Sequence, residues 1–144
     1  MCDDYEALKL KNQICFPLYA ASREIIKRYH PFLTELDLTY TQYITLMVLW
    51  EDKEISVKDL GKKLYLDSGT LTPVLKNLEC RGLITRNRCQ SDERVLIAKI
   101  TDEGMALREK AVIVPYQMSG CSKLDEQDAK ELYRLLYKLL GSME

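Results

Sequence analysis

The segment from Ser56 to Ile100 constrains the fold most, because the period of its apolar residues changes part-way along. It opens with SVKDLGKKLYL, in which Ser56 and Asp59 form the S-x-x-D arrangement that caps a helix N-terminus. The following stretch, DSGTLTPVLKNLECRG, carries the i, i+3, i+4, i+7 stripe of a buried helix face: Leu71, Val74, Leu75 and Leu78. Two short helices in tandem are therefore predicted.

After Gly82, which stands where a glycine ends a helix, the period becomes that of β-structure. LITRNR and VLIAKI are short β-like runs joined by the polar CQSDER, as in a hairpin. Two short helices followed by a hairpin make a winged helix-turn-helix. We expect its core at about residues 53–100, in a mainly α-helical fold with a small β-hairpin.

Long helices are predicted before this core. The first runs from about Tyr5 to Tyr29, with a kink expected at Pro17, whose ring nitrogen cannot donate a backbone hydrogen bond. Pro31 is expected to end it. The second, TYTQYITLMVLWED, has Thr39 as its N-cap.

Two more helices follow the core. Thr101 caps DEGMALREKAVIVPYQM, where Pro115 predicts another kink, and DEQDAKELYRLLYKLL runs from Asp125 as N-cap to Gly141. The last helix has a near-continuous apolar face that needs a partner: Leu132, Leu135, Leu136, Leu139 and Leu140. We expect one domain, residues 1–144, dimerised through helices at about residues 5–30 and 102–141.

Composition limits the class of protein. With 47% hydrophobic and 30% charged residues and no run of about 18 apolar residues, a cytoplasmic chain with no membrane span and no signal peptide is expected. A net charge of −1 argues against nucleic acid. However, residues 58–94 hold eight Lys or Arg against five Asp or Glu, a balance of +3 that leaves −4 elsewhere, which suits a DNA-contacting module.

The five cysteines are Cys2, Cys15, Cys80, Cys89 and Cys121. Their odd number and scattered spacing predict no disulfide framework in a reducing compartment. The sequence has no Cys-x-x-Cys pair and a single histidine, so neither a metal site nor a cofactor is expected.

Four strings, LYLDSGTLTPVLKNLE, RGLITR, SDER and ITDEG, resemble the MarR family of bacterial regulators, and the likeness runs from Gln13 to Leu140. The organic-hydroperoxide-sensing OhrR branch is the most similar. The resemblance implies a homodimer on a pseudo-palindromic DNA operator, with the helix that starts near Asp67 in the major groove and the hairpin in the minor groove.

The candidate DNA-binding residues fall into two groups. Small and hydrogen-bonding groups near the helix N-terminus suit phosphates and base edges, and hairpin arginines suit a narrow minor groove. In the family's D-x-R pattern the aspartate orients the arginine. The residues are Asp67, Ser68, Gly69, Thr70, Thr72, Pro73, Lys76 and Asn77 on the helix, and Arg86, Arg88, Asp92 and Arg94 on the hairpin.

Cys15 gains a role only through the resemblance, since a cysteine on an apolar helix face usually serves packing. The peroxide-sensing branch carries Q-x-C-F-x-x-Y, matched here by Gln13, Cys15, Phe16 and Tyr19. That branch pairs the cysteine with two tyrosine hydroxyls of the partner subunit, and Tyr29 and Tyr40 match them. Pro17 departs from the family pattern. It could start a fresh helical segment, with Cys15 near the positive end of its dipole.

The implied chemistry begins with a thiolate, which phenol hydroxyls stabilise, and ends in a sulfenic acid. An apolar pocket of Phe16, Tyr19, Ile25 and Trp50 would admit alkyl or lipid hydroperoxides. The second thiol is either a low-molecular-weight thiol or Cys121, which stands roughly where two-cysteine members carry theirs. Cys2, Cys80 and Cys89 are given no role.

Three functions compete. The favoured one is a repressor that binds DNA when reduced and releases it when Cys15 is oxidised. The second is a MarR-type regulator of a phenolic or antibiotic ligand, in which Cys15 is structural and Cys15→Ser still responds. The third, a thiol peroxidase, lacks both a Cys-x-x-Cys pair and a thioredoxin-like βαβ pattern, so the chain is not expected to be an enzyme.

Overall fold

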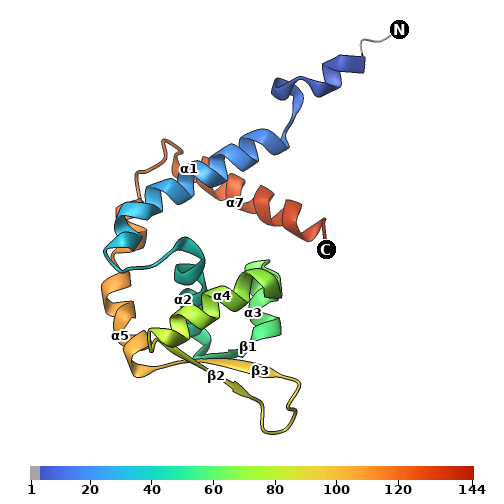
Figure 1. The fold of residues 1–144 in the computed structure, drawn as a ribbon. Helices are drawn as coiled ribbons and strands as arrows, with labels where there is room; N and C mark the ends of the chain where they lie inside the picture. Colours follow the sequence, from blue (N-terminus) through green and yellow to red (C-terminus); the bar gives the residue numbers. More distant parts are fainter. Residues whose placement is uncertain (1–3) are drawn as a thin grey trace.

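The computed structural model describes residues 4–144, so Cys2 lies outside it (Figure 1). Two 3-10 turns, Asp4–Leu8 and Leu10–Asn12, precede the helices. The helices and strands in chain order are α1 (Cys15–Thr34), α2 (Tyr40–Asp52), β1 (Glu54–Ser56), α3 (Val57–Leu64), α4 (Ser68–Cys80), β2 (Ile84–Arg88), β3 (Leu96–Ile100), α5 (Asp102–Ala111), α6 (Val114–Met118) and α7 (Glu126–Gly141).

The predicted hairpin is present as β2 and β3, which pair antiparallel from Ile84 opposite Ile100 to Arg88 opposite Leu96. A third strand, β1, pairs with the other edge of β3, so the sheet order is β1-β3-β2. The sequence did not predict β1, because three residues between two helices are too few to show a β period. The fold is a winged helix-turn-helix, as expected.

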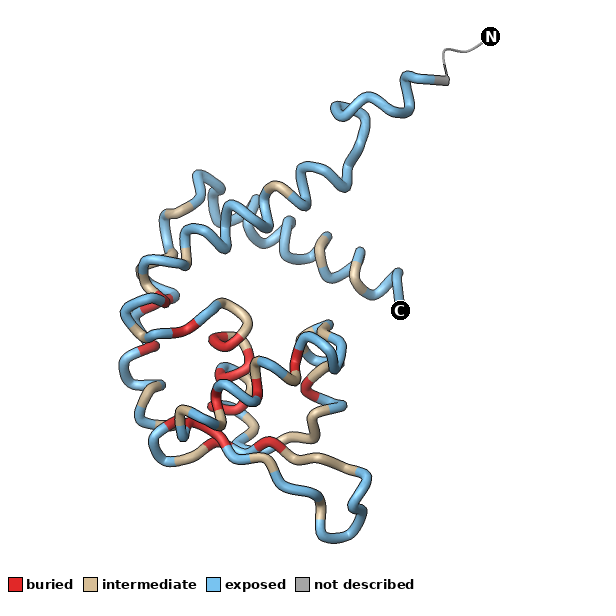
Figure 2. The backbone as a smooth tube through the Cα atoms, in the orientation of Figure 1, coloured by how far each residue is buried: buried red, intermediate tan, exposed pale blue. Residues whose placement is uncertain are grey.

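The core lies between α2, α3, α4 and the sheet, where Figure 2 shows most of the buried segments. Leu46, Leu60 and Leu78 are fully buried there. Trp50 is buried too, and its indole N–H donates to the Gly104 carbonyl at 2.8 Å. Trp50 is therefore a core residue, and its predicted place in a hydroperoxide pocket is wrong.

Side-chain caps set the helix starts, as the sequence predicted. The Thr39 hydroxyl accepts from the Gln42 amide, and the Gln42 side chain accepts from the Thr39 amide, which completes a capping box on α2. The side chains of Ser56, Thr101 and Asp125 each accept from the backbone amide three residues on, and so cap α3, α5 and α7.

The first helix differs from its prediction. It does not run from Tyr5; the chain forms 3-10 turns first, and α1 begins at Cys15. Pro17 therefore lies in the first helical turn, where backbone N–H groups have no intrahelical partner in any case. The kink predicted at Pro17 is wrong, and a fresh helical segment does start at Cys15.

Two further prolines, Pro31 and Pro115, also act differently from expectation. Pro31 lies inside α1, which continues to Thr34 rather than ending at the proline. Pro115 stands near the N-terminus of α6, so the helix predicted from Asp102 to Met118 is divided into α5 and α6. A proline is tolerated in a first helical turn, which explains why a new helix starts there instead of a kink.

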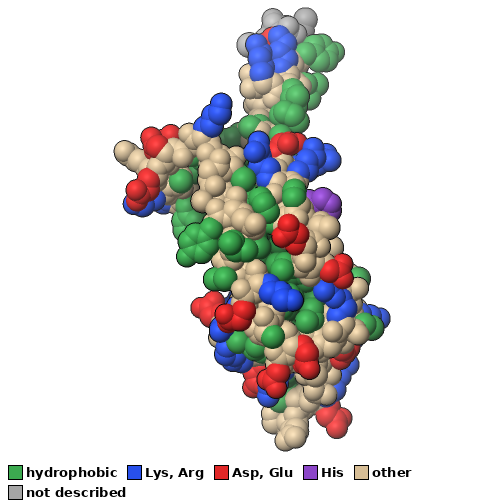
Figure 3. Space-filling view, turned by 90° about the vertical axis from the view of Figure 1, so that its left-hand side faces the viewer, with side chains coloured by type: hydrophobic (Ala, Val, Ile, Leu, Met, Phe, Trp, Pro, Cys, Tyr) green, Lys and Arg blue, Asp and Glu red, His purple; other side chains and the backbone are tan. Residues whose placement is uncertain are grey.

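The helix α7 and the N-terminal half of α1 lie apart from the core (Figure 1), and Figure 2 shows them as almost wholly exposed, whereas Leu33 near the end of α1 is buried in the core. The exposed side chains of α1 and α7 include large apolar ones, among them Leu18, Ile25, Ile26, Leu132, Leu135 and Leu139. Figure 3 shows hydrophobic patches on the upper part of the molecule, which these helices make up. None of the helices within residues 4–144 is long and apolar enough to cross a membrane.

Candidate nucleic-acid interface and thiol site

The exposed start of α4 presents small polar groups in a fixed arrangement. Asp67 is the N-cap and accepts from the Thr70 amide at 2.7 Å, and this hydrogen bond lowers the pKa of the Asp67 carboxyl. Ser68, Gly69 and Thr70 are exposed, while Leu71 behind them is buried. The helix is thus anchored by its apolar stripe and offers its N-terminal turn to a ligand.

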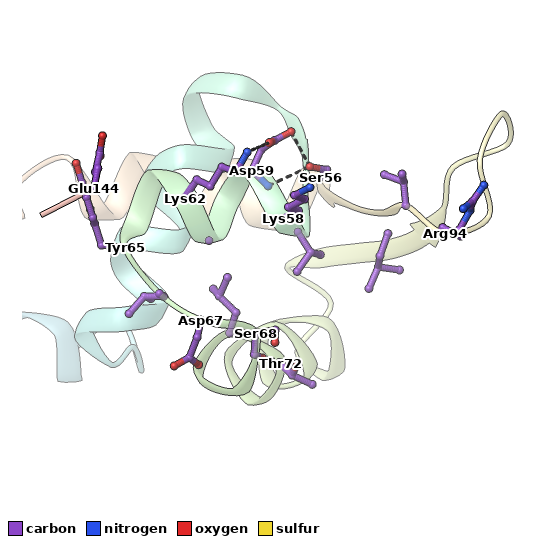
Figure 4. A pocket seen from close by; sticks show the side chains of 16 residues that line it. Ser56, Lys58, Asp59, Lys62, Tyr65, Asp67, Ser68, Thr72, Arg94 and Glu144 are labelled. Carbon is purple, nitrogen blue, oxygen red and sulfur yellow. Dashed lines mark hydrogen bonds and ion pairs between the residues drawn. The ribbon is translucent and has the colours of Figure 1, made fainter. Parts of the chain in front are cut away.

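A groove of about 1260 Å³ runs between α3, the start of α4 and the wing, where the wing is the hairpin β2–β3 with its loop. Figure 4 shows Lys58 and Lys62 from α3, Ser68 and Thr72 from α4, and Arg94 from the wing around it. Three carboxylates, Asp59, Asp67 and Glu144, line the same groove, so its charges are mixed. The three cations and the hydroxyls of Ser68 and Thr72 are the groups in it that suit a polyanion backbone.

Arg94 extends from the wing into solvent, with 95% of its side chain exposed. Asp92 fixes its base: the Asp92 carboxylate accepts from the Arg94 backbone amide at 3.0 Å and lies 3.5 Å from Nε. Arg88, at the end of β2, is exposed as well. The local geometry is the one expected for an oriented arginine.

Arg86 has a different environment from the other wing arginines. Its Nε and Nη2 donate to Glu79 Oε2 at 3.1 and 2.8 Å, and its backbone amide donates to Oε1 at 3.2 Å. Its side chain is only 17% exposed. The guanidinium joins the wing to α4, and the ion pair lowers the pKa of Glu79.

A thiol on the wing had no predicted role. Cys89 Sγ lies 3.1 Å from the Ser91 hydroxyl, and hydrogen bonds from Ser91 lower the pKa of the Cys89 thiol. The sequence showed the residue but not the turn that places Ser91 beside it.

Three tyrosines cluster where α1 meets α2. The ring centroids are 5.0 Å apart for Tyr29 and Tyr40, and 5.9 and 6.4 Å from these two to Tyr43. Burial raises the pKa of all three phenols, so their hydroxyls remain protonated donors at neutral pH. Tyr29 and Tyr40 were predicted from the sequence as a pair, and Tyr43 was not predicted.

Cys121, half-buried after α6, lies close enough to Tyr29 that its negative charge would raise the pKa of that phenol. The Cys121 thiol donates to the Gln117 carbonyl at 3.8 Å and lies 4.0 Å from the Met118 sulfur. One chain therefore brings Tyr29, Tyr40 and Cys121 together.

Cys15 is not part of that cluster within its own chain. It is the first residue of α1, is exposed, and precedes Tyr29 by fourteen helical residues. At about 1.5 Å per residue, the two side chains lie about 21 Å apart along the helix. A thiol–phenol contact therefore requires a second copy of the chain.

Within residues 4–144, no three His, Cys, Asp or Glu side chains lie together as they would around a metal ion. The site consists of an exposed helix N-terminus, a groove of mixed charge that contains three cations, an exposed wing arginine, and thiols with phenols.

Comparison with known proteins identifies the family to which a chain with this fold and these residues belongs. The family model described as transcriptional regulator SarA/Rot matches residues 27–111. The organic hydroperoxide resistance transcriptional regulator of Bacillus subtilis (strain 168) is 48% identical over 99% of this chain and 97% of that protein. The chain belongs to the MarR/SarA family of transcriptional regulators.

Solved structures agree with this family assignment. Reduced AbfR of Staphylococcus epidermidis bound to DNA is 37% identical, covers 98% of each chain and gives a TM-score of 0.78. AbfR with a disulfide formed is 38% identical over 95% of this chain and 96% of that one, with a TM-score of 0.65. A mutant MarR from E. coli complexed with operator DNA is 25% identical over 92% and 99%, with a TM-score of 0.81.

The family consists of DNA-binding regulators rather than enzymes, and the branch is the OhrR-like one that the sequence indicated.

Proposed function

We propose that the chain is a homodimeric repressor that binds a pseudo-palindromic operator when reduced and releases it when an organic hydroperoxide oxidises Cys15. The observation that carries the proposal is the separation of Cys15 from Tyr29, Tyr40 and Cys121 in one chain. Cys15 is one half of the site, and Tyr29, Tyr40 and Cys121 are the other half. Two copies of the chain would bring the two halves together.

The exposed surface of the single chain supports a dimer. The accessible surface is 10879 Å², whereas a folded monomer of 16.7 kDa has about 7,600 Å² by the usual scaling with mass. The exposed large apolar side chains include several on α1 and α7, such as Leu18, Ile25, Leu132 and Leu135. An interface through residues 5–30 and 102–141 would cover those side chains, and the winged core at residues 53–100 would stay free for DNA.

In the dimer, the start of α1 from one protomer would reach the tyrosine cluster of the other. Cys15 begins its helix, so the positive end of the helix dipole favours its thiolate. The phenols of Tyr29 and Tyr40 in the second protomer donate hydrogen bonds to the same thiolate. Phe16, Tyr19 and Ile25, exposed in one chain, would line the approach for an alkyl hydroperoxide.

The sensing reaction is a two-electron oxidation. The Cys15 thiolate attacks the terminal oxygen of the hydroperoxide, the O–O bond breaks, and the alkoxide takes up a proton and leaves as the alcohol. Cys15 becomes a sulfenic acid. A second thiol then attacks its sulfur, so that a disulfide forms and water leaves. Cys121 of the second protomer is well placed for this step, and a low-molecular-weight thiol is the alternative reagent.

The DNA surface would consist of two parts on each protomer. The start of α4, from Asp67 to Thr72 with Pro73 and Lys76, enters the major groove. Arg94, oriented by Asp92, enters the minor groove, and Arg88 reaches the adjacent backbone. Arg86, being bonded to Glu79, would hold the wing at the correct distance from α4 instead of contacting DNA.

A binding experiment tests the proposal. The reduced protein first selects a duplex from a random library, and its affinity for that duplex is then measured before and after one equivalent of cumene hydroperoxide. Wild type should release the duplex, and Cys15→Ser should retain it; Cys80→Ser serves as the control, because Cys80 lies exposed on α4 away from the cluster. Release by Cys15→Ser would contradict the proposal and point to a ligand-responsive regulator.

A further inference from the structure

Two polar connections join the tyrosine cluster to the DNA-facing helix, and neither was visible in the sequence. Both link α4 to the α1–α2 corner, which we define as residues 35–39. This corner lies between the helix that carries Tyr29 and the helix that begins with Tyr40.

The first connection runs through Gln42. Its side-chain oxygen accepts from the Thr39 amide at 2.9 Å, and its side-chain nitrogen donates to Asn77 Oδ1 on α4 at 2.9 Å. Gln42 is a buried polar residue, only 9% exposed, and both ends of its amide are used. Because a buried amide that loses a partner is costly, Asn77 and the start of α2 are held in register.

The second connection runs through Arg81, which follows α4. Its guanidinium donates to the carbonyls of Asp37 at 2.5 Å and Leu36 at 3.4 Å, and lies 3.6 Å from the Asp37 carboxylate. Asp37 has a backbone φ of 53°, a conformation that residues other than glycine seldom adopt. The guanidinium therefore fixes the corner at its tightest turn.

The two connections lie on the edges of a cavity of about 420 Å³, whose lining includes Asp37, Thr39, Gln42, Asn77 and Arg81. Leu38 is the only apolar residue among the described residues that line this space between the corner and the end of α4. On the side of this cavity, the corner is therefore held to α4 mainly by hydrogen bonds. Such bonds constrain direction as well as distance.

We infer that Gln42, Asn77 and Arg81 are positioning residues that transmit the state of the thiol site to the recognition helix α4. The inference rests on the proposed function. Oxidation of Cys15 removes its hydrogen bonds with the second protomer's tyrosines, Tyr40 shifts with the first turn of α2, and the corner moves. The two connections carry that movement to the C-terminal half of α4, which rotates its exposed N-terminal turn away from the DNA.

Allosteric coupling is measured as a ratio, so the test compares DNA affinity in two states. The double variant Asn77→Ala/Arg81→Gln removes both connections while Gln42 keeps its capping box. For each protein the dissociation constant for the selected duplex is measured reduced and after cumene hydroperoxide, together with the rate of Cys15 oxidation and the thermal midpoint. Lys76→Ala is the matched control, since Lys76 is an exposed neighbour of Asn77 on the same helix.

In the wild type, the ratio of oxidised to reduced dissociation constants should fall in the usual allosteric range of about 5- to 150-fold. In the double variant it should approach unity, with Cys15 oxidised at the wild-type rate. Lys76→Ala should weaken binding in both states and leave the ratio unchanged. A purely structural role would lower the thermal midpoint without changing the ratio.

The outcomes separate the two proposals. If wild type keeps its DNA after Cys15 is oxidised, the proposed function is wrong. If wild type releases DNA and the double variant releases it equally well, only the present inference is wrong. Should the double variant not fold, Asn77→Ala and Arg81→Gln are measured as single variants, each of which removes one connection. Ratios equal to that of wild type in both would then overturn the inference.

Discussion

Glu79 on α4 and Arg86 on β2 share three hydrogen bonds, the shortest being 2.8 Å from Arg86 Nη2 to Glu79 Oε2. One of the three is donated by the backbone amide of Arg86, so Glu79 fixes the path of β2 as well as the position of the Arg86 side chain. The recognition helix and the wing are therefore set at a constant spacing before any DNA is bound, which saves ordering cost on binding.

Replacing Glu79 should loosen that spacing. We expect Glu79→Gln to weaken operator binding several-fold, because wing and helix must then be ordered by the DNA itself. Glu93→Gln is the control, as Glu93 is an exposed wing carboxylate without an ion pair among the described residues. Equal affinities for the two variants, measured by fluorescence anisotropy, would contradict the positioning role.

The same pair predicts a pH dependence of stability. Arg86 lowers the pKa of Glu79 in the folded chain below the usual 4.5 of a glutamate. The contribution of the pair is therefore fully present above about pH 4.5 and is lost as the pH falls through the folded value. Thermal midpoints of wild type and Glu79→Gln should differ at pH 7 and converge in acid. A difference that is constant with pH would rule this out.

Arg86 and Arg94 should respond in opposite ways to alanine substitution. Arg94→Ala should leave the thermal midpoint unchanged, since 95% of the side chain is exposed, but lower DNA affinity and reduce the salt dependence by about one phosphate contact. Arg86→Ala should lower the midpoint. Titrations at several salt concentrations with melting curves make the comparison, and an unchanged salt slope in Arg94→Ala would contradict its assignment.

Sequence patterns were sufficient for the parts of the fold that local physics determines. The caps at Thr39, Ser56, Thr101 and Asp125 and the hairpin were predicted because a short polar side chain or a change of period is visible within a few residues. The prolines were misjudged, since Pro17 acts as a helix-starting residue only if the chain before it is not α-helical, which a periodicity that spans both sides does not reveal.

The candidate site divides in the same way. The exposed residues of α4 could be named from the sequence, because the buried stripe fixes which face is left. That Arg86 bonds to Glu79, or Gln42 to Asn77, depends on how α2, α4 and the sheet pack, over separations that no local pattern encodes. Tyr43 was missed for the same reason: it joins Tyr29 only once α1 and α2 are packed together.

The phenols should control how fast Cys15 reacts. Tyr29→Phe and Tyr40→Phe each remove one hydrogen-bond donor from the proposed Cys15 site while keeping the ring, so the oxidation of Cys15 should slow. Stopped-flow oxidation by cumene hydroperoxide measures the rate, with Tyr133→Phe, an exposed residue of α7, as control. Rates equal to that of the control would leave the phenols a packing role.

Cys121 should determine what happens after the first oxidation. Wild type treated with one equivalent of hydroperoxide should run as a covalent dimer on a non-reducing gel, and Cys121→Ser should stay monomeric with a lasting sulfenic acid. Cys89→Ser provides the comparison, because hydrogen bonds from Ser91 lower the pKa of the Cys89 thiol and this thiol could react on its own. A crosslink that survives in Cys121→Ser would exclude Cys121 as the second thiol.

The central claim is that each sensing site is built from two chains, and hybrid dimers test it most directly. A Cys15→Ser chain keeps Tyr29 and Tyr40, and a Tyr29→Phe/Tyr40→Phe chain keeps Cys15, so a mixed dimer regains one complete site only if the groups meet across the interface. We predict rapid oxidation of about half of the Cys15-bearing sites expected in wild type, whereas both parent homodimers react slowly or not at all. If Cys15 in the mixed dimers is oxidised no faster than in the Tyr29→Phe/Tyr40→Phe homodimer, the account is contradicted.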